Sequence, residues 1–353
     1  MTTATIAPSP PVPASAAELL ARSGEIARDL AGAEHSAWNG QIAEAPAGVL
    51  GLAHWDGTLY LDRESILDPL HHLYEHAGED HAIPTLARYR EALATLLHEH
   101  AHFLGPSGST QESAREAFLK PGSRELEEGV TEAWAQDHLD EYIHRLGIDR
   151  VAPGINSVQA PGYYAAFVPA VRKLSADLEN RNGLRRGEVL DLLNRQTADG
   201  QFPLLVDLVY NSTRLPDLEL PPGVMTRSRL ENTLRSGLAH LDAYELTAPS
   251  FATAKSLSTA DHILDHLNHE IRTAESASLF TPTSTALAVS SSTGHALPPT
   301  RHAPTPTHQI PPPHHAALTG IAPPTAPRPA NTHLRPAHTS PRLTRGGLHR
   351  PAQ

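Results

Sequence analysis

The chain has 353 residues, of which 39% are hydrophobic and 19% charged, and its formal net charge is −11. This composition allows one or two folded domains with a buried core. The chain has no cysteine, which excludes disulfides and thiolate metal ligands. An acidic chain without an apolar run of about 18 residues offers neither a basic surface for phosphates nor a membrane span. We therefore expect no nucleic-acid partner and no membrane insertion.

The first segment, residues 1–14, is rich in Thr, Ala and Pro, a composition typical of disorder. It has neither the basic start nor the apolar block of an export signal, which predicts a cytoplasmic protein or one exported by a signal-independent route. Ser15 and Glu18 then form a capping box, which predicts a helix from Ala16 to about Leu30.

A β-hairpin is predicted next. The short apolar runs Gly48–Trp55 and Thr58–Asp62 are joined by Asp56-Gly57, a pair typical of tight hairpin turns. His54 is expected to be a strand residue with a hydrogen bond, not a metal ligand.

The following segment, residues 64–82, is predicted to be helical and is rich in histidine. Its histidines are His71, His72, His76 and His81. His72 and His76 are four residues apart and could share a metal ion, but no acidic pattern accompanies them. A solvated helix face is the favoured interpretation.

A buried helix is predicted between Pro84, which suits a first helical turn, and Gly105-Pro106, which suits a stop. It contains the pattern His-Glu-x-x-His at His98-Glu99-His100-Ala101-His102. Residues four apart share one helix face, so His98 and His102 can direct two imidazole nitrogens at one metal ion. Glu99 then lies beside the metal, where a base can take a proton from water, while His100 points away.

A third ligand is expected from the next long helix. Ser109 and Glu112 predict a cap for a short helix over 111–120, and Ser123 is expected to cap a helix from Arg124 to Leu146. In that helix, Glu128 would complete a set of two histidines and one carboxylate, which is typical of catalytic zinc sites.

These motifs carry a resemblance. His98-Glu99-x-x-His102 followed by Leu-Glu-Glu-Gly-Val-Thr-Glu over 126–132 resembles the gluzincin metallopeptidases, the group that includes thermolysin and the aminopeptidase N-like enzymes. The resemblance covers roughly residues 84–146. It implies that Glu128 is the third zinc ligand and that Glu132 orients a zinc histidine. The subfamily is unassigned, because Glu127 stands where the aminopeptidase branch often has Asn and because the gap between the motifs is longer.

The resemblance also implies a zincin fold, in which a small sheet precedes the active-site helix and an edge strand holds the peptide substrate. The hairpin is a candidate for that role, with a purely structural hairpin as the open alternative. Glu125 and Glu127 are expected to be solvated carboxylates that interact favourably with the helix dipole.

Downstream, Pro161-Gly162 is expected to open a helix that reaches about Asn180. Several zincins use a tyrosine from a downstream helix to stabilise an oxyanion, which makes Tyr163 the catalytic candidate and Tyr164 its alternative. A core role for these aromatic residues is the favoured interpretation. Further helices are predicted in a helical lobe, near residues 185–196, 203–211, 226–246 and 260–273.

The last segment, residues 276–353, holds 15 of the 32 prolines, six arginines and no acidic residue. Since this tail contributes +6 to the net charge of −11, residues 1–275 carry −17. We expect a disordered Pro-, Thr- and His-rich tail that could meet a polyproline-binding partner.

The sequence thus predicts an α+β, predominantly helical protein. It comprises a disordered segment (1–14), a zincin-like core (15–150), a helical lobe (151–275) and a disordered tail (276–353). The predicted function is that of a Zn²⁺-dependent peptidase acting on a peptide or protein substrate. Its metal ligands would be His98, His102 and Glu128, with Glu99 and Tyr163 catalytic and Glu132 supporting a ligand. The rival hypothesis is a catalytically inactive zincin-like scaffold that binds partners through its tail.

Overall fold

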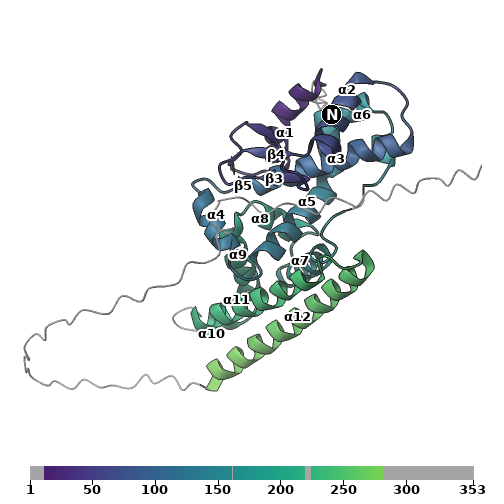
Figure 1. Ribbon diagram of the computed structural model, residues 1–353. Helices are drawn as coiled ribbons and strands as arrows, with labels where there is room; N and C mark the ends of the chain where they lie inside the picture. The colour runs from purple at the N-terminus through teal and green to yellow at the C-terminus, as the bar shows by residue number, and fades with distance from the viewer. Residues whose placement is uncertain (1–11, 161, 219–223, 281–353) are drawn as a thin grey trace, which may run out of the picture.

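The computed structural model describes residues 12–160, 162–218 and 224–280 (Figure 1). Over these residues the protein is predominantly helical with a small sheet, which confirms the predicted α+β class. None of the helices in the described ranges is long and apolar enough to cross a membrane. The predictions of disorder for residues 1–11 and 281–353 lie outside the described residues. The tail boundary at 276 is wrong, because α12 (Pro249–Phe280) continues through that position.

The N-terminal helix α1 (Ala16–Ala31) begins as predicted. The Ser15 hydroxyl accepts a hydrogen bond from the Glu18 N–H at 3.2 Å, and the Glu18 carboxylate accepts one from the Ala14 N–H at 2.8 Å. These contacts satisfy donors that the first helical turn leaves without a partner.

The predicted hairpin is confirmed and is part of a three-stranded sheet. Strand β3 (Gly51–Ala53) pairs antiparallel with β4 (Leu59–Leu61) across a turn in which Gly57 has a φ of 87°. Strand β2 (Ile42–Glu44), which the sequence did not predict, pairs parallel with the other side of β4. The strand order is therefore β2-β4-β3, which makes β3 an edge strand.

The histidine-rich segment is helical over a shorter range than predicted. A single π-helical turn, η1 (Arg63–Leu67), leads directly into α2 (Asp68–Glu75). The long helix α3 (Ile83–His102) follows, with Pro84 in its first turn as predicted. It ends before Gly105-Pro106, because Leu104–Gly105 forms a short strand, β5, that pairs with β1 (His35–Ser36).

Helix α4 (Gln111–Phe118) is capped by Thr110, whose hydroxyl accepts from the Ser113 N–H, and not by Ser109 as predicted. Helix α5 (Ser123–Leu146) begins at Ser123 after Gly122, so the predicted serine cap is also wrong. Gly122 has a φ of 78°, and a Cβ there would lie 2.6 Å from the Arg235 carbonyl oxygen. Glycine is required at this position both for the backbone conformation and for the close approach.

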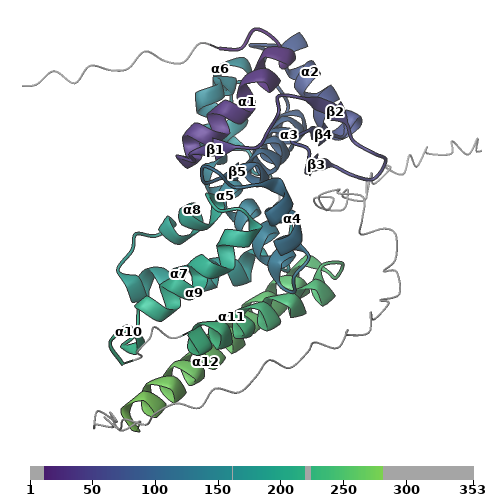
Figure 2. The same ribbon diagram turned by 90° about the vertical axis from the view of Figure 1, so that its left-hand side faces the viewer.

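The remainder of the described chain is helical. The helix predicted to start at Pro161-Gly162 is wrong at its beginning, since α7 starts at Val168. The elements after α5 are α6 (Ile148–Val151), η2 (Ile155–Ser157), α7 (Val168–Asn182), α8 (Glu188–Asn194), α9 (Ala198–Asn211), α10 (Leu215–Leu218), α11 (Val224–Ala239), η3 (His240–Tyr244) and α12. Helices α11 and α12 lie side by side at the end of the molecule away from the sheet (Figures 1 and 2).

Two hydrophobic cores meet along α5. Its first turns contribute Leu126 and Val130 to a core formed mainly by α7, α9, α11 and α12. Its later turns contribute Trp134 and Tyr142 to a core shared with α1, α2 and α3. Because a helix buried on several faces is fixed from all sides, α5 provides a rigid support for the polar residues it carries between the two cores.

Candidate metal centre

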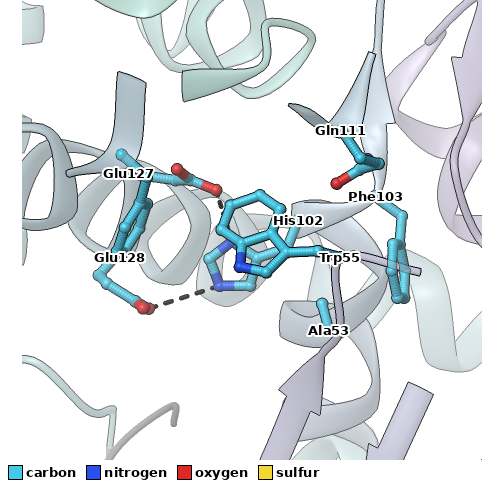
Figure 3. A pocket seen from close by; sticks show the side chains of 8 residues that line it. Ala53, Trp55, His102, Phe103, Gln111, Glu127 and Glu128 are labelled. Carbon is cyan, nitrogen blue, oxygen red and sulfur yellow. Dashed lines mark hydrogen bonds and ion pairs between the residues drawn. The ribbon is translucent and has the colours of Figure 1, made fainter. Parts of the chain in front are cut away.

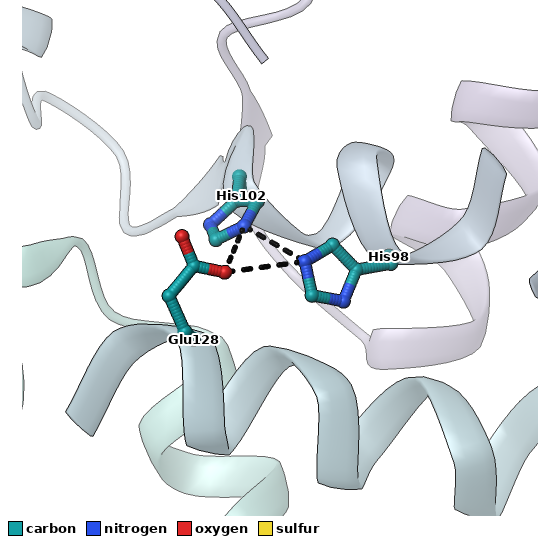
Figure 4. A group of neighbouring side chains, drawn as sticks. All are labelled: His98, His102 and Glu128. Atoms are coloured by element: carbon teal, nitrogen blue, oxygen red, sulfur yellow. Dashed lines mark hydrogen bonds and ion pairs between the residues drawn. The ribbon is translucent and has the colours of Figure 1, made fainter. Parts of the chain in front are cut away.

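The last turn of α3 presents two histidines on one face. The imidazole rings of His98 and His102 meet at 76°, with their centroids 4.9 Å apart. Their Nε2 atoms are 3.2 Å apart (Figure 4). The i, i+4 spacing on a buried helix thus brings two potential ligand atoms to one point.

Glu128 reaches the same point from α5. Its Oε2 atom lies 3.4 Å from the Nε2 atoms of both His98 and His102. The residue is 0% exposed, and neither carboxylate oxygen has a hydrogen-bond partner. A buried carboxylate without hydrogen bonds is costly unless positive charge compensates it. The donor set of two imidazoles and one carboxylate therefore fits a divalent metal ion.

Two further carboxylates of α5 hold the far side of the two rings. Glu132 Oε2 lies 2.9 Å from His98 Nδ1, and Glu127 Oε1 lies 3.0 Å from His102 Nδ1. An ionised carboxylate only accepts hydrogen bonds, so each Nδ1–H must donate. Each Nε2 atom faces Glu128 and becomes available as a metal ligand once it loses its proton, which is the arrangement that metal-binding histidines require.

The structure places Glu132 against His98, where the sequence interpretation expected a supporting carboxylate. Glu127 and Glu125 were expected to be solvated, and this is wrong for both, since they are 9% and 7% exposed. Glu127 is the functional residue that the sequence interpretation missed. Two histidines that both bind through Nε2 leave two Nδ1–H groups in need of acceptors, and this requirement could have pointed to Glu127.

A second layer of hydrogen bonds fixes Glu132. Its Oε1 atom accepts from the Gln136 side-chain amide at 2.8 Å and from the Tyr163 backbone N–H at 2.9 Å. Gly162 makes this arrangement possible, since a Cβ at that position would lie 1.8 Å from the Gln136 amide nitrogen. All these contacts favour the ionised form of Glu132.

The neighbouring carboxylates and the two imidazoles shift the pKa values of Glu128, His98 and His102 in the protein without a metal. Burial by itself would raise the pKa of Glu128, but the His102 and His98 rings hold it well below its usual range. Burial lowers the pKa of His98, yet Glu128 and Glu132 outweigh this effect and raise it to about 9. The pKa of His102 is likewise raised by Glu128 and Glu127 against the effect of burial. The cluster therefore attracts positive charge strongly.

Glu99 lies next to the cluster in sequence but is held against the sheet. It is 0% exposed, and its Oε2 atom accepts a hydrogen bond from the Ala53 N–H of β3 at 2.8 Å. Gly51 leaves room for it, since a Cβ there would lie 2.5 Å from Glu99 Oε1. The α3 helix and the edge strand are thus joined at this carboxylate.

The two candidate tyrosines occupy different positions. Tyr163 contacts the site through its backbone N–H, and burial together with Glu91 and Glu132 raises the pKa of its phenol. Tyr164, the alternative, stacks its ring on that of His98 with centroids 5.8 Å apart and an interplanar angle of 16°. Tyr164 is also the one non-glycine residue of the described chain with a positive φ, at 53°. Such a backbone conformation costs free energy and is found preferentially at functional sites.

A narrow pocket opens beside His102 and Glu128 (Figure 3). Its cavity volume is about 20 Å³, which is room for about one water molecule. It is lined by Ala53, Trp55, His102, Phe103, Gln111, Phe118, Glu127 and Glu128. Glu99 and both tyrosines are not among the lining residues.

Other histidines singled out in the sequence serve structural roles. His100 is buried, contacts the Ser23 hydroxyl at 2.7 Å and packs edge-to-face on Trp38. Burial lowers the pKa of His100 to about 3, so its ring is neutral. His54 contacts the Asp56 carboxylate in the hairpin turn, which agrees with the predicted hydrogen-bonding role.

Within the described ranges, His98, His102 and Glu128 form the one group of three or more potential ligands close enough to hold a metal ion. No protein-family model, curated protein or solved structure matches the chain.

Proposed function

We propose that the protein is a zinc-dependent peptidase of the gluzincin type, with a zincin-like arrangement of hairpin, α3 and α5. The observation that carries this proposal is the convergence of His98 Nε2, His102 Nε2 and Glu128 Oε2 within 3.2–3.4 Å of one another. Each histidine is oriented by its own carboxylate. Zinc is the metal that this donor set suits best, and three protein ligands leave a coordination position for chemistry.

Zinc bound by these residues would polarise a peptide carbonyl and make water more acidic. Glu99 directly follows His98 in the motif and is proposed to take the proton from water and to pass it to the leaving amine. The Ala53 N–H holds one oxygen of this carboxylate in place. Tyr164, by its contact with the His98 ring, is better placed than Tyr163 to stabilise an oxyanion.

The edge strand β3 supports a peptide substrate over other acyl compounds. It lies at the border of the sheet and is joined to the catalytic carboxylate through Ala53. An extended peptide can add to such an edge by main-chain hydrogen bonds. We propose that the bound peptide lies along β3 with its scissile carbonyl at the metal.

The experiment that tests the function compares the wild type with Glu99→Gln. The purified full chain is loaded with zinc, its metal content is measured, and a mixed peptide library is digested. We expect Glu99→Gln to keep one zinc per chain and to lose hydrolysis by about 10²–10⁴-fold. Glu91→Gln, two turns earlier on α3, is the matched control and should retain activity. Full activity in Glu99→Gln would refute this mechanism.

A second function, a zinc-binding scaffold without catalysis, is favoured by one observation. Glu99 is fully buried and does not line the pocket beside His102. In a scaffold, its carboxylate would serve only to join α3 to β3. Zinc binding without cleavage of any library peptide would favour this alternative.

A further inference from the structure

The pocket beside the metal ligands has an apolar wall in addition to His102, Glu127 and Glu128. Two segments form most of this wall. Ala53 and Trp55 come from the end of β3 and the turn after it, and Phe118 comes from the last turn of α4. The ring centroids of Trp55 and Phe118 are 5.9 Å apart with an interplanar angle of 70°, an edge-to-face contact that closes the wall.

The Trp55 side of this wall is anchored by hydrogen bonds. The side-chain amide of Asn39 donates to the Asp56 carbonyl at 3.1 Å and to the Thr58 hydroxyl at 3.2 Å. The Asn39 N–H donates to the Gly57 carbonyl at 3.0 Å. Gly57 itself lies so close to the backbone that a Cβ would be 2.4 Å from the Ala37 carbonyl oxygen. The turn that carries Trp55 is therefore fixed on the segment below it.

The Phe118 side is anchored by packing. Helix α4 contacts α9 and α5, and it buries Ala114 and Ala117 on its inner face. Phe118 is half-buried at the end of the same helix. Since both sides of the wall rest on ordered elements, the width of the pocket is a property of the fold and not of one mobile side chain.

The cavity volume is about 20 Å³, and one water molecule needs about 10–15 Å³ on this measure. A methyl group, which is about the size of a water molecule, fits such a space, whereas a phenyl or isobutyl group does not. We propose that this pocket selects a small side chain next to the scissile bond, that of glycine or alanine, and that Trp55 and Phe118 set the limit. This inference rests on the proposed function, because it assumes that the substrate carbonyl is held at His98, His102 and Glu128.

The test uses metal-directed ligands of graded size, so that its readout is binding and not turnover. Zinc content of the full chain is measured first. Calorimetry then gives the Kd of acetohydroxamic acid, which carries a methyl group, and of phenylacetohydroxamic acid, which carries a benzyl group. We expect the benzyl compound to bind at least about 10-fold more weakly to the wild type, because it overfills the pocket.

Phe118→Ala should remove the difference in Kd between the methyl and the benzyl compound. We expect it to tighten binding of the benzyl compound by about 10-fold or more while changing the methyl compound by less than about 2-fold. Trp55→Phe, a smaller change in the opposite side of the wall, provides a second variant should Phe118→Ala fail to fold. Phe251→Ala is the matched control, because Phe251 is 49% exposed on α12, outside the pocket.

The outcomes separate the two proposals. A zinc-loaded wild type that binds the benzyl compound as tightly as the methyl compound would overturn the size limit while leaving the metal site intact. The size limit would also be overturned if neither compound bound to the zinc-loaded wild type. It would be overturned as well if neither Phe118→Ala nor Trp55→Phe changed the Kd of the benzyl compound. A chain that takes up no zinc would refute the proposed function itself, and the inference with it.

Discussion

Two pairs of histidines four residues apart were candidates for a metal site in the sequence, and in the structure only His98 and His102 lie close to a third potential ligand. On α3, His98 and His102 meet a carboxylate at their Nε2 atoms and a different carboxylate at each Nδ1. At the end of α2, His72 and His76, the residue that caps the helix, stack their rings with centroids 4.2 Å apart. There, His72 contacts the Tyr89 hydroxyl and His76 contacts the His72 carbonyl oxygen.

The difference comes from the neighbouring helix. Helix α5 packs against α3 and supplies Glu127, Glu128 and Glu132, which occupy three positions around the two rings. Among the described residues, His72 is bonded to a phenol and His76 to a backbone carbonyl, and no carboxylate forms an ion pair with either ring. The spacing of two histidines is therefore necessary for this kind of site but does not create it; a second element must provide the third ligand and the hydrogen bonds that orient the rings.

The largest expected effect is the loss of the third ligand. Glu128→Gln keeps the shape of the side chain but removes its negative charge, which should weaken zinc binding by more than about 100-fold. Isothermal titration with zinc against a competing chelator measures this change. Glu125→Gln, one turn earlier on α5, is the control and should bind zinc like the wild type. Equal zinc affinity in the two variants would mean that Glu128 is not a ligand.

A smaller effect is expected from the carboxylates that orient the rings. Glu127→Ala and Glu132→Ala should each lower zinc affinity by about 10- to 100-fold, since an imidazole without its acceptor is less basic and less well positioned. Glu127→Gln and Glu132→Gln should restore part of the affinity, because an amide oxygen still accepts from Nδ1–H. Glu141→Ala on the exposed side of α5 controls for helix stability. If both alanine variants bound zinc as tightly as the wild type, the orientation of the rings by Glu127 and Glu132 would contribute nothing to zinc affinity.

His100, which lies between the two candidate ligands, is expected to affect the free energy of unfolding and not the zinc affinity. The pKa of His100 is lowered from 6.5 to about 3 by burial in the folded protein. Between these values the unfolded chain binds more protons, so the stability contributed by neutral His100 is present above pH 6.5 and is lost as the pH falls towards 3. The loss should be about 1.4 kcal/mol per pH unit in this window.

His100→Gln checks this expectation, because the amide can still donate to the Ser23 hydroxyl and does not titrate. Urea unfolding between pH 6.5 and 4 should show a flatter pH dependence in the variant than in the wild type. If the free energy of unfolding changed with pH equally in the wild type and in His100→Gln, the assignment of a buried neutral ring would be refuted.

The smallest effect is expected on α2. His72→Gln and His76→Gln should leave zinc affinity unchanged and alter the free energy of unfolding by only about 0.5 kcal/mol, as is usual for surface positions. The same chelator competition and urea unfolding measure both quantities. A marked loss of zinc affinity in either variant would break the distinction between the two histidine pairs.

The sequence was informative where structure is local. Helix α3 and the hairpin follow from periodicity, turn residues and motif spacing. The choice of Glu128 among the carboxylates of α5 depended on the resemblance to the gluzincin pattern, because the contact between α3 and α5 is long-range. The parallel pairing of β2 with β4 was not predictable in this way, because it joins segments through long-range hydrogen bonds. The burial of Glu127 was missed for the same reason: an acidic first turn is ordinary on an isolated helix, and only the packing of α5 against α3 turns it towards His102.

The left-handed backbone at Tyr164 could not be foreseen either. A tyrosine is rare in this conformation, so the pattern of apolar residues favoured a helix from 162 onwards. Instead, α7 begins at Val168, and Tyr164, in the segment before it, stacks on the ring of His98. The tertiary contact between Tyr164 and His98 thus accompanies a backbone conformation that the local preference does not favour.

The most direct test of the central claim is X-ray absorption spectroscopy at the zinc edge on the full chain loaded with one equivalent of zinc. The chain has 23 histidines, so zinc content alone does not identify the ligands. The account predicts one zinc coordinated by two imidazoles and by oxygen donors, at about 2.0–2.1 Å. A spectrum with three or more imidazoles per zinc, or with none, would contradict the site formed by His98, His102 and Glu128.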